Sequence, residues 1–174
     1  MIDAFSILWS DLTALKRRWP RYLLTTLMSP LLYLMAFGWG LGRGIDMNGT
    51  SYLDFVIPGI IALTAMTTSF NGAGTRLNVD RLYFKSFDEC LMAPVELPSI
   101  LLGKALIGVV RGILSSVAFL LVAFLIARHI HITLPFVLGL LLSCLTFAFL
   151  GVLAALLARS HEDMATFGSL ILMP

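Results

Sequence analysis

Apolar residues form long stretches along most of the chain, and charged residues fall mainly between them. A helix needs roughly 20 consecutive apolar residues to cross the hydrocarbon core of a bilayer. Backbone groups inside a bilayer must be bonded internally, and no stretch alternates apolar and polar residues as barrel strands do, so the pattern predicts transmembrane helices. The stretches long enough to cross are 22–42, 55–75, 105–127 and 134–158, and a shorter one begins at 164 and runs to 174.

The first 20 residues follow a different pattern, in which apolar side chains recur at helical spacing and polar ones lie between them. This spacing predicts an amphipathic helix with Trp9 and Trp19 on its apolar face and Lys16 to Arg18 at its end. Aromatic rings beside a basic cluster are typical of a helix that lies in the headgroup plane. The alternative is an ordinary soluble helix. Pro20 then turns the chain toward the membrane.

Composition supports a membrane protein. Of 174 residues, 59% are hydrophobic and only 13% are charged, which excludes an ordinary soluble domain. The net charge of +2 is small, and the placement of lysine and arginine is better explained by membrane topology than by an anionic partner. No nucleic-acid partner is therefore expected. Positive residues gather on the cytoplasmic side of membranes. We expect a multi-pass protein of the inner (plasma) membrane, and this rule predicts its orientation. Its amino terminus and segments 76–104 and 159–163 would be cytoplasmic, and loops 43–54 and 128–135 would face outside.

Nucleotide chemistry needs a glycine-rich loop ending in lysine and serine or threonine. The nearest approach is Gly103-Lys104, but Ala105 follows it. We therefore expect no cofactor and no enzymatic activity on this chain.

The loop predicted for 76–100 contains a short amphipathic pattern. Phe84, Phe87 and Leu91 share one helical face, whereas Asp88 and Glu89 point elsewhere. Such a helix is either an anchor at the interface or a docking element for a cytoplasmic partner, and periodicity does not separate the two.

Two further patterns lie within predicted spans. Thr64, Thr68 and Asn71 form one polar stripe, which either lines a route for polar cargo or bonds to neighbouring helices. Arg111 lies about 10 Å deeper than Lys104 along a helix, and pairing near the inner face is favoured over a substrate contact.

The chain resembles the permeases of type-2 ABC exporters. The resemblance rests on the amphipathic amino-terminal helix and on two segments, YLDFVIPGII from Tyr52 and SFDECLMAPVELPSILLGK from Ser86. It implies an all-α, polytopic transmembrane bundle with four full spans, the start of a fifth, an interfacial amino-terminal helix and a cytoplasmic coupling helix. Because family members commonly have six spans, the chain is expected to be truncated within the fifth.

The resemblance also implies partners and roles. The partners would be a separate ABC ATP-binding subunit, which holds ATP and Mg, a second permease copy in a homodimer or heterodimer, and membrane lipid. Arg111 would anchor the inner end of its helix. The coupling residues would be Phe84, Phe87, Asp88, Glu89 and Leu91, and the pathway residues Thr64, Thr68 and Asn71.

The rival interpretation is a secondary transporter or channel that is not driven by ATP. Such proteins normally carry a charge or a broken helix pair near the midplane, and this chain is short of carboxylates inside its predicted spans. Drug, lipo-oligosaccharide and polysaccharide cargoes all remain open.

Overall fold

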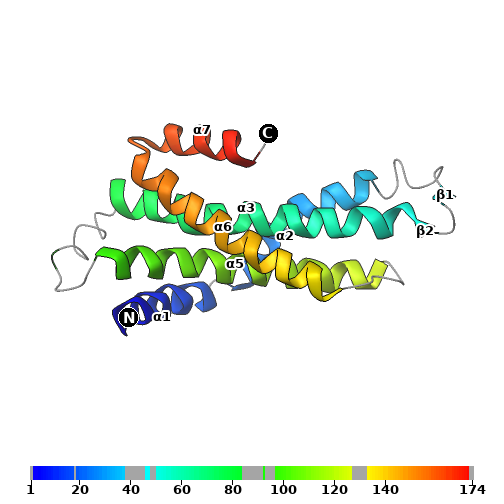
Figure 1. Cartoon of the computed structure of the whole chain (residues 1–174), viewed down its shortest axis with the longest axis horizontal. Helices are drawn as coiled ribbons and strands as arrows, with labels where there is room; N and C mark the ends of the chain where they lie inside the picture. The colour runs from blue at the N-terminus through cyan, green and yellow to red at the C-terminus, as the bar shows by residue number, and fades with distance from the viewer. Residues whose placement is uncertain are drawn as a thin grey trace.

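Long helices lie side by side and form the body of the protein (Figure 1). The computed structural model describes residues 2–17, 19–37, 46–47, 50–83, 92, 97–126 and 133–172. The helices are α1 (Ile2–Arg17), α2 (Trp19–Met35), α3 (Tyr52–Leu82), α5 (Leu97–Ile126), α6 (Leu134–Leu157) and α7 (His161–Leu172). Two short strands, β1 (Asp46–Met47) and β2 (Thr50–Ser51), pair antiparallel just before α3. The helical membrane fold predicted from the sequence is confirmed, with this small hairpin added.

Three helices in the described residues are long and apolar enough to cross a membrane: Val56–Leu82, Leu97–Phe124 and Leu134–Leu157. The first predicted span, 22–42, is described as an α-helix only to Met35, and its apolar part Tyr22–Met35 is shorter than the other three. Residues 38–45 lie outside the described residues. The described chain therefore contains three such helices, where the sequence predicted four full spans.

Two helices extend into the loop predicted for 76–100. Helix α3 continues to Leu82, and α5 already begins at Leu97 rather than near 105. The prediction from the charge pattern placed the end of each span at the first charged residue. A helix does not have to end there, because a charge that finds a partner is tolerated, and Asp80 of α3 pairs with Lys104 of α5.

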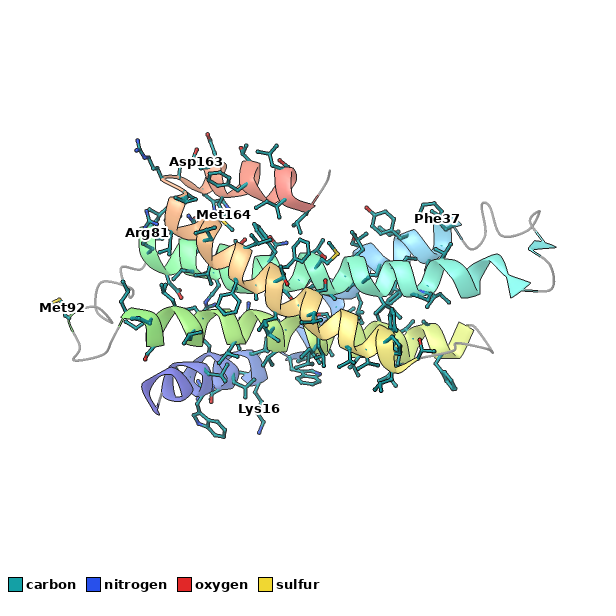
Figure 2. All side chains as sticks on the ribbon, viewed as in Figure 1. Lys16, Phe37, Arg81, Met92, Asp163 and Met164 are labelled. Carbon is teal, nitrogen blue, oxygen red and sulfur yellow. The ribbon has the colours of Figure 1, made fainter. Side chains whose placement is uncertain are left out.

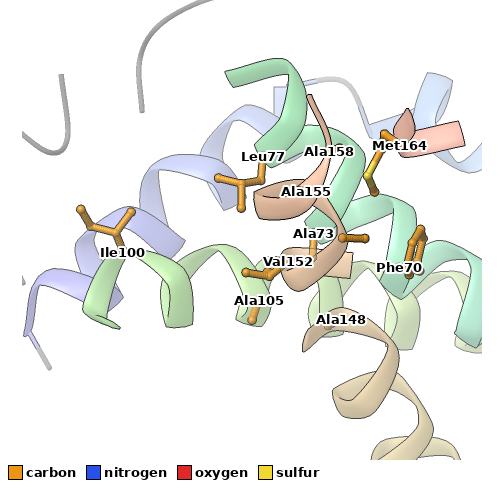
Figure 3. Close-up of a cluster of buried hydrophobic side chains, with 11 residues drawn as sticks. Phe70, Ala73, Leu77, Ile100, Ala105, Ala148, Val152, Ala155, Ala158 and Met164 are labelled. Atoms are coloured by element: carbon orange, nitrogen blue, oxygen red, sulfur yellow. The ribbon is translucent and has the colours of Figure 1, made fainter. Parts of the chain in front are cut away.

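Helix α3 is the centre of the packing, with α5 and α6 as its main neighbours. One buried cluster joins α3, α5, α6 and α7 through residues that include Phe70, Leu77, Val152 and Met164 (Figure 3). A second cluster joins α2, α3 and α5 around Phe119. Several alanines belong to these clusters, and small residues at the contacts let helices approach closely.

A close approach brings Gly74 of α3 against Gly151 of α6. A Cβ added to Gly74 would lie 2.5 Å from the Gly151 carbonyl oxygen, so neither position has room for a side chain. Gly108 of α5 likewise faces Ala73 and the Ser69 carbonyl of α3.

Charged residues from several segments lie at one end of the bundle, which we call the charged end. Arg81, Met92 and Asp163 appear at this end in Figure 2, and the chain's amino terminus lies there too (Figure 1). The β1–β2 hairpin and the start of α6 lie at the opposite end (Figure 1). The described parts of segments 76–104 and 159–163, which the charge rule assigned to the cytoplasmic side, thus share one end of the fold with the start of α1.

Candidate functional site

A cleft of about 500 Å³ lies between α2, α3 and α7. Its α3 wall runs from Leu63 to Thr75, which is about 18 Å along a helix axis. The cleft therefore reaches from near the charged end toward the middle of α3. Its lining is polar for a helical bundle, because hydroxyl and amide side chains come from all three helices. These are Thr26, Ser29 and Tyr33 of α2, Thr64, Thr67, Thr68, Asn71 and Thr75 of α3, and Ser169 of α7.

The three pathway residues predicted from the sequence all line this cleft. Thr64 is buried, Thr68 is half-buried and Asn71 is exposed. The alternative reading of this stripe was bonding between helices. In the described residues, the Thr64 hydroxyl donates to the Ile60 carbonyl at 2.7 Å, and the Thr68 hydroxyl donates to the Thr64 carbonyl, both within α3. Contact with cargo stays a prediction.

A second polar site, at the charged end, holds a buried ion network. The Lys104 ammonium lies 2.9 Å from a carboxylate oxygen of Asp11 and 2.9 Å from one of Asp80. These three side chains are each 11% exposed and come from α5, α1 and α3. The half-exposed Arg76 adds a looser pair to Asp80 at 3.6 Å. Two cations therefore balance two carboxylates, and three helices are joined at one point.

The sequence pattern missed this network. Asp11 belongs to the polar side of the amphipathic pattern, yet it is 8% exposed because it faces Lys104 rather than water. Trp9, placed on the apolar face, is 61% exposed in the described chain. The sequence did contain an indication, because Asp11 is an acidic residue in a helix expected to lie at the membrane interface. A buried carboxylate there needs a cationic partner.

Arg111 lies about two turns beyond Lys104 on α5. Its guanidinium carbon is 5.6 Å from the centre of the Tyr22 ring of α2, and the Tyr22 hydroxyl is 3.3 Å from the Ser115 hydroxyl. No carboxylate among the described residues lies within ion-pair distance of Arg111. The observed contact is a cation over an aromatic ring, which links α5 to α2. The anchoring role remains a prediction.

The predicted coupling residues, Phe84, Phe87, Asp88, Glu89 and Leu91, lie outside the described residues. Helix α3 leads directly toward them from Leu82. Across the part of the chain that the structure describes, no group of three or more histidine, cysteine, aspartate or glutamate side chains is placed to hold a metal.

Long apolar helices, a hydroxyl-lined cleft and a charge network confined to one end define a polytopic membrane protein of the transport class. The family model of the ABC-2 type transporter matches residues 3–174. The chain belongs to this family. It is therefore part of a membrane-spanning permease subunit of an ABC transporter, a class that works with an ABC ATP-binding subunit.

Named relatives agree with this assignment. The chain is 25% identical over 174 residues to the inner membrane transport permease YadH of Escherichia coli (strain K12), covering 98% of this chain and 68% of the relative. It is 28% identical over 163 residues to nodulation protein J of Neorhizobium galegae, covering 92% of this chain and 62% of the relative. The nodulation protein J of Rhizobium meliloti is 27% identical, over 59% of its length. No solved structure matches the chain significantly.

Proposed function

We propose that this chain forms part of the transmembrane pathway of an ATP-driven exporter of the inner (plasma) membrane. The observation that carries this proposal is the cleft between α2, α3 and α7, where the polar stripe of α3 opens into a space of about 500 Å³. This size suits small-molecule sites or the headgroup of a larger cargo. Thr64, Thr68 and Asn71 are the proposed pathway residues.

The energy source in this proposal lies on a partner. A separate ABC subunit binds ATP and Mg, and this chain carries pathway and selectivity without its own nucleotide site. The segment holding Phe84, Phe87, Asp88, Glu89 and Leu91 docks on that subunit. Its support is that α3 ends at Leu82 at the charged end and that Met92 lies at the same end.

Orientation and assembly complete the proposal. The charged end faces the cytoplasm, as the positive-inside rule favours, so the amino terminus is inside. A second permease copy, identical or related, and membrane lipid surround the bundle. Arg111 holds the inner part of α5 against Tyr22 of α2. ATP-driven closure of the docked subunits then shifts the permease pair between inward and outward states.

The pathway is tested with Thr68→Val and Asn71→Leu in the full-length permease co-expressed with its ATPase. The matched control is Thr146→Val, because Thr146 is exposed on α6 and donates the same kind of bond, to the Leu142 carbonyl at 2.8 Å. Export should fall in the two cleft variants at unchanged membrane levels and remain normal in the control. Normal export by both cleft variants would remove the pathway role.

Coupling is tested by disulfide crosslinking to the ATPase. Single cysteines are placed at Asp88 or Glu89 after Cys90 and Cys144 are replaced. The control is a cysteine at Thr133, which precedes α6 at the opposite end of the bundle. A crosslink from 88 or 89 and none from 133 is expected. Failure at every position from Leu82 to Met92 would refute docking by this segment.

A further inference from the structure

The threonine hydroxyls on the α3 wall of the cleft have already used their hydrogen atoms. Thr64 donates to the Ile60 carbonyl at 2.7 Å, and Thr67 donates to the Leu63 carbonyl at 2.8 Å. Thr68 donates to the Thr64 carbonyl. A hydroxyl has one hydrogen and two lone pairs. These side chains therefore present acceptors, and not donors, to whatever occupies the cleft.

Other polar groups in the lining add to the excess of hydrogen-bond acceptors over donors. The Ser169 hydroxyl of α7 donates to the Thr166 carbonyl at 2.8 Å. The Thr75 hydroxyl donates to the Asn71 side-chain oxygen at 3.4 Å, which leaves the amide NH₂ of Asn71 as the fixed donor of the α3 wall. Hydroxyls on α2 can turn either way, so the excess of acceptors comes from α3 and α7.

Positive charge is missing from the cleft lining. None of the residues lining it in the described chain is a lysine or arginine, and His161 at the charged end is its one histidine. Arg81 donates to backbone carbonyls of α6 and Lys104 pairs with two carboxylates. Arg76, which follows the lining residue Thr75, pairs with Asp80 at 3.6 Å. An anion entering the cleft would lose water without meeting a lysine or arginine among the lining residues, which is unfavourable in a membrane protein.

Apolar side chains complete the lining. Leu63 of α3 and Leu172 of α7 border the same space as the threonines. The cleft thus offers hydrogen-bond acceptors beside hydrocarbon, which matches a molecule with a donor-rich polar part and an apolar part.

We infer that the cleft binds the uncharged, hydroxyl- or amide-bearing headgroup of an amphiphile and discriminates against anionic headgroups. This inference rests on the proposed function, because it names the chemical class of cargo for the same pathway. The threonine bonds to the backbone carry it, since they fix the polarity of the site before any ligand arrives.

The test compares decyl glucoside with decyl sulfate, which share a chain and differ in headgroup. A single cysteine at Thr67 is placed in the full-length permease with its ATPase in nanodiscs, after Cys90 and Cys144 are replaced, and its reaction with a neutral maleimide is timed. Decyl glucoside should slow the reaction by at least about fivefold, the effect of roughly one net hydrogen bond, and decyl sulfate should not. A cysteine at Thr146 on exposed α6 corrects for partition into the bilayer.

The outcomes separate the two proposals. Equal or stronger protection by decyl sulfate overturns the headgroup inference but leaves the pathway in place. Absence of protection by either amphiphile also overturns the headgroup inference, and the pathway is then decided by export in the Thr68→Val and Asn71→Leu variants. As a positive arm, Asn71→Lys adds a cation at an exposed cleft position and should allow decyl sulfate to protect. If glucoside alone still protects in that variant, charge does not set the preference and the inference fails.

Discussion

The guanidinium of Arg81 on α3 donates a hydrogen bond of 2.7 Å to the backbone carbonyl of Ala155 on α6. The same side chain donates to the Leu156 carbonyl at 2.8 Å and to the Ala158 carbonyl at 3.1 Å. The last carbonyls of a helix have no partner within the helix and carry partial negative charge. Arg81 therefore caps α6 from a neighbouring helix, at the end of α3 that leads toward the proposed coupling segment.

Replacing Arg81 by alanine should destabilise the full-length permease by about 2–3 kcal/mol, because carbonyls lose a charged donor. The stability of Arg81→Lys should lie between those of the wild type and Arg81→Ala, since an ammonium keeps the charge but lacks the planar guanidinium group. Thermal unfolding in detergent measures the loss, with Arg17→Ala at an exposed position as the control. Equal stability of Arg81→Ala and Arg17→Ala would show that the cap is energetically unimportant.

The Lys104 network predicts that a single substitution costs more stability than a triple one. Lys104→Met leaves the Asp11 and Asp80 carboxylates buried without their shared cation, and breaking a buried pair costs about 3–5 kcal/mol. Adding Asp11→Asn and Asp80→Asn should recover much of that loss, because the unpaired charges disappear.

Chemical unfolding of the full-length variants measures this recovery. Lys16→Met, at an exposed position of α1, is the control and should leave stability unchanged. A triple variant no more stable than Lys104→Met would mean that Lys104 acts through packing of its carbon chain and not through its charge.

The sequence predicted the helical membrane fold because long apolar stretches have few alternatives in a bilayer. It also grouped Thr64, Thr68 and Asn71, since helical spacing determines which residues share a face, and the cleft lies along that face. It did not predict which elements supply the opposite wall. Contact between α3 and α7 joins residues about a hundred positions apart along the chain, and periodicity within one helix carries no information about that neighbour.

Charge placement was predicted only in part. Lysine and arginine counts grouped the segments that share the charged end, but they gave no partner for Lys104 or Arg81. Asp11 looked like a solvated residue because an amphipathic pattern records one helix at a time. Its burial depends on Lys104 of α5 lying opposite, which is a tertiary contact.

Gly74→Ala should weaken the contact between α3 and α6. The added Cβ would lie 2.5 Å from the Gly151 carbonyl oxygen, and backbone cannot move aside as a flexible side chain can. We expect a loss of about 1–3 kcal/mol, the usual cost of overpacking. Gly59→Ala and Gly139→Ala are matched controls, because nothing lies within 4 Å of a Cβ at either position.

The controls should be neutral or slightly stabilising, since alanine favours helix over glycine by up to about 1 kcal/mol. Unfolding temperature and the yield of assembled transporter report the difference. If Gly74→Ala has the same unfolding temperature and yield as Gly59→Ala, α3 and α6 can separate enough to accept the added methyl group, and the close approach does not limit packing.

The Asn78 side chain on α3 is fully buried, and neither the nitrogen nor the oxygen of its amide has a hydrogen-bond partner among the described residues. A buried polar group without a partner costs about 1–3 kcal/mol, so Asn78→Leu, which keeps the branched arrangement of side-chain heavy atoms, should raise the free energy of unfolding by up to that amount. Asn71→Leu, at an exposed position two turns earlier, should leave it unchanged. Lower stability of Asn78→Leu in the full-length protein would instead show that the amide bonds to a group elsewhere in the assembled transporter.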